Sequence, residues 1–255
     1  QSFSSYFNYI ILQLSYPEEK KGKNETWKDH LARLEKIHTK GNYIGLKYNV
    51  VYRLVNAANY GIPQKRERVI ITGIKDSLNI EWSFPKETHS KERLLWDKYI
   101  TGKYWDEHRV SKSEVSIPNK REILSIQKLK NKYGFFEPEE KAWATVRQAL
   151  KDLPNPIKIT NFRPDHEFRK GAKIYPGHTG SFIDEPSKTI KAGDHGVPGG
   201  ENMIRFTNGA VRYFTVFEAK RIQTFPDNYF ISGSWTEAMR QLGNAVPVKL
   251  SQIIS

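Results

Sequence analysis

Apolar and aromatic residues recur at helical spacing in two segments near the start of the chain. The first segment runs from Phe3 to Leu14, and Pro17 marks its end because proline cannot continue a helix. The second carries its apolar residues between positions 27 and 37 and stops near Gly41. The pattern therefore predicts two amphipathic helices, each with one face against a core.

Two runs of β-branched and aromatic residues follow these helices. Residues 48–55, YNVVYRLV, and residues 68–74, RVIITGI, are each typical of a strand, and the turn sequence NAANYGIP lies between them. The second run is almost continuously apolar, which predicts burial on both faces of a sheet. Two helices followed by two strands predict an α/β fold, in which these residues form the last part of a doubly wound sheet.

The character of the sequence changes between residues 77 and 205. Periodicity weakens there, and the stretch SKSEVSIPNKREILSIQKLKNKYG is basic and predicted to be rich in loops. One helix is predicted at TVRQALKDLP, where Thr145 and Gln148 fit a capping box. The segment KAGDHGVPGGEN, residues 191–202, is a glycine-rich loop between two short strand candidates. We interpret this region as a smaller, irregular and mainly β domain inserted into the first.

Helical signals return after residue 206. Thr215 with Glu218 and Ser234 with Glu237 have the spacing of capping boxes, and Pro247 suits the first position of a final helix. The sequence thus predicts three parts: residues 1–76, residues 77–205, and a helical return to the first domain at residues 206–255.

Composition narrows the possible partners and chemistry. A net charge of +13 favours a polyanionic partner, above all nucleic acid. The chain has no cysteine, which excludes disulfides, thiolate metal sites and a cysteine nucleophile within it. No apolar run has the roughly 18 residues that span a bilayer, and the histidines do not indicate a metal site. The chain opens on glutamine and ends just after an apolar pair, so we expect it to be part of a longer protein or a single subunit.

The sequence QKRER, residues 64–68, places two arginines one residue apart at the beginning of a strand. One interpretation is an exposed strand end, with an ion pair to Glu67. The other is a pair of guanidinium groups that point to a ligand, because alternate strand positions share a face. Spacing alone leaves both interpretations open.

Three segments carry a resemblance to a known family. NAANYGIPQKRERVIITGI, residues 56–74, resembles motif VIII of the DNA cytosine-5 methyltransferases. RYFTVFEAKRIQTFPDNYFISGS, residues 212–234, resembles their motif IX, and RQLGNAVPV, residues 240–248, resembles their motif X. The three occur in the family's order, separated by a long stretch where the family has its target recognition domain. The family's Phe-x-Gly-x-Gly, Pro-Cys and Glu-Asn-Val motifs are absent from this sequence.

The resemblance implies an activity and a fold. This chain would be the C-terminal portion of a Rossmann-like, S-adenosylmethionine-dependent methyltransferase, with a target recognition domain. Arg68 would bind a cytosine flipped out of the duplex, and Arg66 would support the base or the side of the attacking thiolate. Asn244, Ala245 and Val246 would lie beside S-adenosylmethionine, although Asn244 is also suited to capping a helix. Motif IX would pack the recognition domain against the catalytic one.

The inserted region is expected to contact DNA. Charged, hydroxyl and glycine residues on two segments are the candidates for base or phosphate contacts: Lys188, Thr189, Lys191, Gly193, Asp194, His195 and Gly196 on the first, and Arg163 and Arg169, with Lys170 and His178, on the second. The alternative for the first segment is a surface loop with no partner.

Several interpretations remain open. The chain is one subunit of a split enzyme or the tail of a longer one, and in either case we expect it to be inactive alone because the nucleophilic cysteine is missing. Its partners would be double-stranded DNA and the N-terminal half of the methyltransferase, in the cytoplasm of a bacterium, near the nucleoid, within a restriction–modification system. A non-catalytic, sequence-specific DNA-binding module derived from a methyltransferase is the alternative function, and a basic RNA-binding protein is a third.

Overall fold

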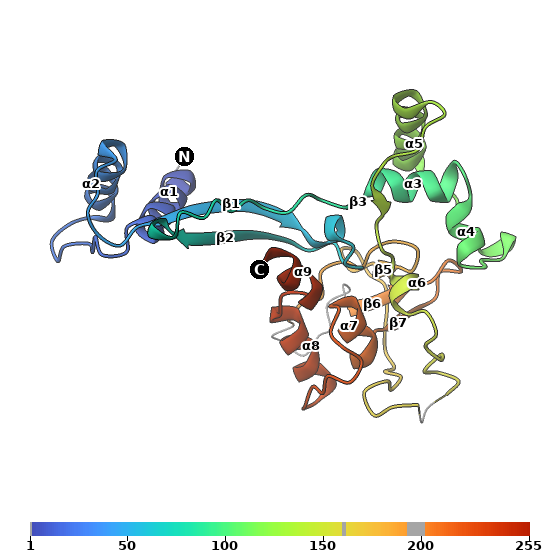
Figure 1. Cartoon of the computed structure of the whole chain (residues 1–255). Helices are drawn as coiled ribbons and strands as arrows, with labels where there is room; N and C mark the ends of the chain where they lie inside the picture. The colour runs from blue at the N-terminus through green and yellow to red at the C-terminus, as the bar shows by residue number, and fades with distance from the viewer. Residues whose placement is uncertain (1, 160–161, 193–201) are drawn as a thin grey trace. The chain divides into compact units, whose positions relative to one another are not determined.

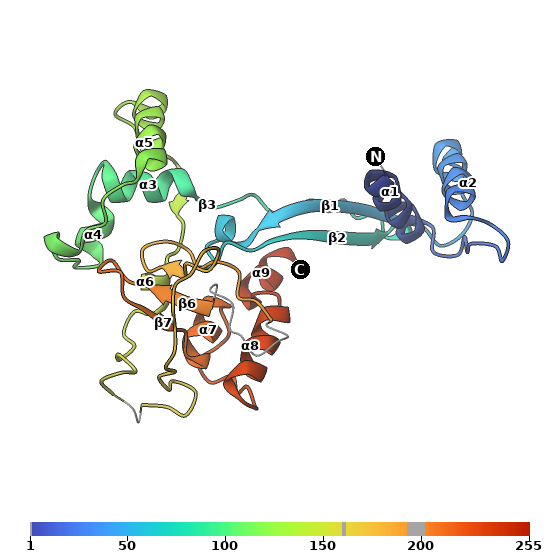
Figure 2. The same cartoon turned by 180° about the vertical axis from the view of Figure 1, so that it is seen from behind.

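The computed structural model describes residues 2–159, 162–192 and 202–255. The chain divides into two compact units, of which the first consists of residues 1–54 and 68–84 and the second of residues 55–67 and 85–255. Figures 1 and 2 show the elements of both units from opposite sides. Residues 206–255 thus belong to the same unit as most of the inserted region. The domain boundaries expected after residues 76 and 205 stay a prediction.

Two helices form the core of the first unit, as the apolar spacing predicts. They are α1 (Ser2–Ser15) and α2 (Trp27–Lys40), and Tyr9, Leu12, Tyr16 and Leu34 are buried between them. A capping box at Thr26 begins α2, and Gly41, with φ of 70°, ends it in the left-handed conformation that glycine adopts readily. Both predicted helices are confirmed.

The predicted strands form an antiparallel pair, β1 (Tyr48–Asn56) and β2 (Glu67–Lys75), followed by the 3-10 turn η2 (Asp76–Leu78) (Figure 1). Several of their large apolar side chains are exposed, with 61% of Leu54 and 51% of Val69 accessible, whereas Val55 is buried. The prediction of burial on both faces is therefore wrong for this chain. Phe7 of α1 contacts Tyr52 of β1, with ring centroids 4.9 Å apart, but a sheet of two strands offers little surface for burial on both faces. The larger doubly wound sheet stays a prediction.

Short helices dominate the inserted region in the second unit. After the 3-10 helix η1 (Ala57–Tyr60), the elements up to residue 150 are β3 (His89–Ser90), α3 (Lys91–Tyr99), α4 (Lys103–Glu107), η3 (Lys112–Glu114), α5 (Lys120–Tyr133), β4 (Lys141–Ala142) and α6 (Val146–Ala149). Strand β3 pairs with β4 in parallel. The expectation of a mainly β region is wrong for the described residues. In particular, α5 begins at a capping box of Asn119 and Glu122 within the stretch predicted to be loops.

A three-stranded sheet and three helices complete the second unit. Strand β6 (Met203–Arg205) lies between β5 (Ser181–Phe182), parallel to it, and β7 (Val211–Tyr213), antiparallel to it. The helices are α7 (Val216–Ile222), α8 (Trp235–Asn244) and α9 (Val248–Ile254). Both views show α7 against this sheet, and the main core joins Ile190 and Ile204 with Ile222 and Leu242 of the helices.

The helix starts in this unit follow the predicted capping signals. Capping boxes are present at Thr145 and Thr215, and the side chain of Ser234 accepts a hydrogen bond from Glu237 N. Pro247 is the residue before α9 rather than its first residue. Among the described residues, no helix is long and apolar enough to cross a membrane, and no group of three or more His, Cys, Asp or Glu side chains forms a candidate metal site.

Candidate active site where three motifs meet

The QKR part of QKRER lies alongside residues 185–190 in the second unit. Gln64 and Ser187 form a parallel bridge, in which Lys65 N donates to Ser187 O at 2.7 Å and Ser187 N donates to Pro63 O at 2.9 Å. The hydroxyl of Thr189 adds a hydrogen bond to Lys65 O at 2.9 Å. Motif VIII is thus paired, backbone to backbone, with the predicted DNA-contacting segment.

The side chain of Arg66 joins this pair to motif X. It is 3% exposed, and its Nη2 donates to Gly243 O at 2.8 Å, while Nη1 approaches Ile190 O at 3.4 Å. Hydrogen bonds from a charged group are stronger than neutral ones, and a buried guanidinium stays charged. Arg66 therefore holds together two backbone segments that lie 124 and 177 residues away in the sequence.

Gly243 lies in close contact with the backbone of the recognition segment. A Cβ atom built on it would lie 2.6 Å from the carbonyl carbon of Lys191 and 2.8 Å from Ala192 Cα. Only a residue without a side chain allows α8 to lie this close to another backbone. The glycine in the middle of the helical pattern is the sequence signal that could have identified this contact.

Charged side chains lie around Lys65, in the middle of motif VIII. Glu185 lies between Lys65, at 3.5 Å, and Lys98, at 3.1 Å. Burial alone would lower the pKa of Lys98, but the neighbouring Glu185 carboxylate raises it above its ordinary value. The amide of buried Gln64 has no hydrogen-bond partner among the described residues, so this side chain is the least satisfied polar group near Arg66.

The predicted cofactor residues lie at the turn between α8 and α9. Asn244 is the last residue of α8, and Ala245 N closes the helix on Gln241 O. Asn244 is exposed, as is 49% of Val246. Gln223 of motif IX supports the turn, because its side-chain Nε2 donates to Leu242 O and its backbone carbonyl accepts from Val248 N.

Motif IX is built around a buried ion pair. Both terminal nitrogens of Arg212 donate to Glu218, at 2.6 and 2.7 Å, and only 1% of the Glu218 side chain is exposed. Glu218 also accepts from Thr215 N, so the same carboxylate closes the capping box. Arg221 pairs with Asp227 instead, and this pairing lowers the pKa of Asp227. These contacts are internal to motif IX, and its role in packing the recognition domain against the catalytic one stays a prediction.

A match to a family model follows the same segments. The model of the C-5 cytosine-specific DNA methylases matches residues 23–255. The chain belongs to this family. Its similarity to curated relatives extends over most of the chain: it is 30% identical to Type II methyltransferase M.SacI of Streptomyces achromogenes, with 90% of this chain and 56% of the relative covered. It is 29% identical to M.NgoFVII of Neisseria gonorrhoeae, covering 78% and 47%, and 25% identical to M.MthTI of Methanothermobacter thermautotrophicus, covering 88% and 59%.

The chain therefore spans about half the length of the curated methyltransferases that it matches. Among solved structures, the S. pombe Dnmt2 methyltransferase is similar with a TM-score of 0.42 and 15% identity, over 88% of this chain and 58% of that one. The family-model match confirms the resemblance carried by motifs VIII, IX and X, and the position of this chain in the C-terminal part of an enzyme stays a prediction.

The other arginine of the methylase motif, Arg68, lies in the first unit. It is exposed near the beginning of β2. Its predicted role in binding a flipped cytosine stays a prediction, as does the shared face with Arg66.

The predicted DNA-contacting residues of this chain have different surroundings. The hydroxyl of Thr189 donates to Lys65 O, which uses the hydrogen that a phosphate contact requires. Lys188 is half-buried and donates to Thr179 at 2.7 Å, whereas Lys191 is exposed. Gly193, Asp194, His195 and Gly196 lie outside the described residues.

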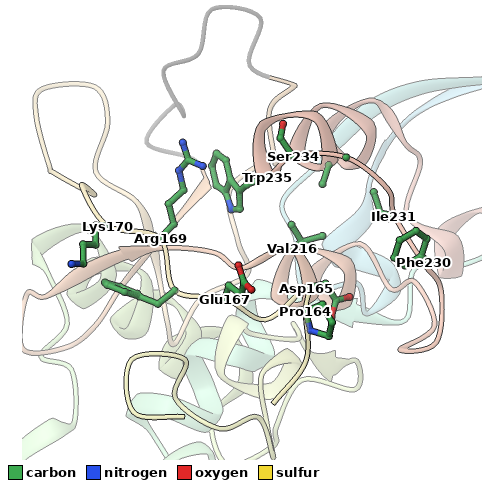
Figure 3. A pocket seen from close by; sticks show the side chains of 13 residues that line it. Pro164, Asp165, Glu167, Arg169, Lys170, Val216, Phe230, Ile231, Ser234 and Trp235 are labelled. Carbon is green, nitrogen blue, oxygen red and sulfur yellow. The ribbon is translucent and has the colours of Figure 1, made fainter. Parts of the chain in front are cut away.

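The second predicted segment lines a cavity of about 590 Å³ (Figure 3). Arg169 lies over the Trp235 ring, 4.5 Å from its centroid, and Lys170 is close by. Arg163 is held by Asp165 at 3.0 Å and by Asp227 O at 2.8 Å, so its role is structural in part. His178 stacks on Tyr175 within a tight turn.

Proposed function

We propose that this chain supplies target recognition, and part of the base and cofactor pockets, to a DNA cytosine-5 methyltransferase. The complete enzyme transfers a methyl group from S-adenosylmethionine to carbon 5 of cytosine within a specific duplex site. The observation that carries the proposal is the position of Arg66, whose hydrogen bonds join motif VIII to the recognition segment at Ile190 and to motif X at Gly243. These three parts need a fixed arrangement when base, DNA site and methyl donor must meet.

The missing chemistry comes from the N-terminal half of the methyltransferase, in the same chain or in a separate subunit. This sequence has no cysteine to act as the nucleophile. The first unit supports such a partner, because large apolar side chains on both strands of its hairpin are exposed, among them Tyr52, Leu54, Val69 and Ile71. Exposed apolar patches of this kind mark surfaces that another part of a protein covers. Burial of these strands is then a property of the assembled enzyme.

Arg68 is the residue that we assign to the flipped cytosine. Flipping costs a few kcal/mol in lost stacking and pairing, so the pocket must recover this through contacts with the base. A guanidinium keeps its charge in a water-poor pocket and can stabilise negative charge that develops on the ring. Arg66 supports the pocket through the backbone that it fixes.

Asn244, Ala245 and Val246 would form one wall of the S-adenosylmethionine site. The exposed amide of Asn244 can donate and accept hydrogen bonds, and the exposed side chain of Val246 offers an apolar surface. These properties suit a ligand with polar and apolar parts. The bound cofactor supplies the methyl group, and these residues only position it.

DNA would be bound by the basic surface of the second unit, with Lys188, Lys191, Arg163 and Arg169 as contacts together with residues 193–196. The similarity to Type II methyltransferases favours a bacterial restriction–modification system, in which the enzyme would work near the nucleoid in the cytoplasm. A surplus of 13 positive charges makes binding depend steeply on salt.

Transfer of tritium from labelled S-adenosylmethionine to DNA tests the proposal. We expect no transfer by the chain alone and clear transfer after it is combined with the cysteine-bearing half. In the combined enzyme, Arg68→Ala should slow methylation far more than it weakens duplex binding. Arg53→Ala, which removes an exposed arginine from β1, is the matched control. Activity of the chain alone contradicts the proposal, and equal losses of methylation and binding by Arg68→Ala favour a non-catalytic DNA-binding module.

A further inference from the structure

Asn202 clamps the backbone of a residue that lies 11 positions earlier in the sequence. Its Nδ2 donates to Lys191 O at 3.2 Å, and its Oδ1 accepts from Lys191 N at 3.1 Å. Asn202 is 1% exposed, and its own carbonyl accepts a hydrogen bond from Phe214 N. One side chain therefore ties the recognition segment to the beginning of β6.

The clamp acts on a backbone that is fixed on its other sides as well. Ile190, just before Lys191, is fully buried in the main core, and its carbonyl faces Arg66. Ala192, just after it, lies against Gly243 of α8. Motif VIII, motif X and β6 thus enclose residues 190–192.

A buried asparagine is less favourable than an apolar residue when its only role is to fill space. An apolar side chain would fill the same space without requiring two hydrogen bonds, and a buried polar group that loses its partners destabilises the fold. An amide, however, matches both groups of one peptide backbone at once, because it carries a donor and an acceptor side by side. The geometry therefore points to a need for a defined position of Lys191, more than for a filled core.

We propose that Asn202 is a positioning residue for target recognition. It sets the backbone of Lys191, so that the exposed lysine side chain meets the DNA in one register relative to the base pocket at motif VIII. The inference rests on the proposed function, and it assigns Asn202 a role in choosing the DNA site. Asn202 itself does not touch DNA in this assignment.

The test uses the assembled enzyme and the DNA site that it methylates, identified beforehand by sequencing methylated DNA. Asn202→Ala removes both hydrogen bonds. Asn202→Asp keeps the volume but places a second oxygen against Lys191 O, so it tests the clamp even if the alanine variant folds poorly. Asn208→Ala is the matched control, because Asn208 is an exposed asparagine whose side chain accepts a hydrogen bond from Ala210 N within the neighbouring turn.

The measured quantity is the ratio of kcat/KM for the methylated site to kcat/KM for a site with one base pair changed. We expect both Asn202 variants to lower this ratio at least tenfold, while Asn208→Ala leaves it unchanged. A merely structural residue would lower activity on both DNAs by the same factor, and an unchanged ratio in Asn202→Asp overturns the proposal. If the unaltered assembled enzyme methylates no DNA, the proposed function fails instead.

Discussion

Replacing Gly243 by alanine tests the close contact between motif X and the recognition segment. The new methyl carbon would lie 2.6 Å from the carbonyl carbon of Lys191 and 2.8 Å from Ala192 Cα. Carbon atoms prefer separations of about 3.5–4.0 Å, so one of the two backbones must move by about 1 Å. Both neighbours are backbone atoms, which cannot move aside as the end of a flexible side chain can.

The size of the effect follows from three contributions. Overpacking a tight site costs about 1–3 kcal/mol. The movement also weakens the hydrogen bond from Arg66 to Gly243 O, and a bond to a charged group contributes about 1.5–3 kcal/mol. Alanine is better than glycine inside a helix by about 1 kcal/mol, which offsets part of the loss. We therefore expect Gly243→Ala to lower the free energy of unfolding by about 1.5–5 kcal/mol.

Urea unfolding of the assembled enzyme, followed by tryptophan fluorescence, measures this difference. Trp235 lies at the beginning of the same helix and reports on it. Gly22→Ala is the control, because its added methyl would have Glu25 Cβ at 3.5 Å as its nearest neighbour, which is an ordinary contact. The reasoning is refuted if Gly243→Ala is as stable as the original or gains the roughly 1 kcal/mol expected from helix propensity alone.

Three further changes probe other parts of the second unit. Arg66→Lys keeps the positive charge, but the lysine side chain cannot reach both carbonyl oxygens. We therefore expect methylation by the assembled enzyme, measured by tritium transfer, to fall at least tenfold. Binding to nonspecific DNA, measured by filter binding, should change less than twofold. Glu218→Gln leaves Arg212 buried without its carboxylate, and removal of one partner of such a pair costs about 3–5 kcal/mol, which urea unfolding detects. Burial, followed by the charge of Arg147, lowers the pKa of His108 below its ordinary 6.5. At pH values between the lowered pKa of His108 in the folded protein and its ordinary pKa of 6.5 in the unfolded chain, the unfolded state binds more protons. The free energy of unfolding therefore falls as the pH drops below 6.5. We expect His108→Gln to reduce this fall, and an unchanged pH dependence would contradict the assignment.

Local patterns sufficed to predict much of the first unit. Both helices and both strands lie within two residues of the expected bounds, and α2 ends at Lys40, just before Gly41, as expected. Helical spacing and strand composition depend on neighbours in the sequence, which is why these elements could be predicted. Helix α5 was missed, although Asn119 and Glu122 formed a readable capping box, because many lysines dilute its apolar stripe. Only Ile126 and Leu129 are buried in that helix.

The candidate site was only partly readable from the sequence. The motif identifies Arg66, but its partners are 124 and 177 residues away, and no local pattern specifies such contacts. Asn202 gives no signal at all, because an isolated asparagine beside glycines is usual in a turn. The contact of Thr189 was also not predictable: its hydroxyl suggested a phosphate contact in the sequence, but it donates a hydrogen bond to Lys65 O in the fold.

The charges of the second unit have two separate uses. Arg212 and Glu218 form a buried pair that is neutral as a whole, whereas Glu185 is shared by Lys98 and Lys65. Neutral pairs leave the chain's surplus of 13 positive charges unchanged, so this surplus must come from the other lysines and arginines. Exposed side chains such as Lys191 and Arg169 belong to that set. Salt should therefore weaken DNA binding through the exposed cations and leave the buried pairs, which set the geometry of the site, largely intact.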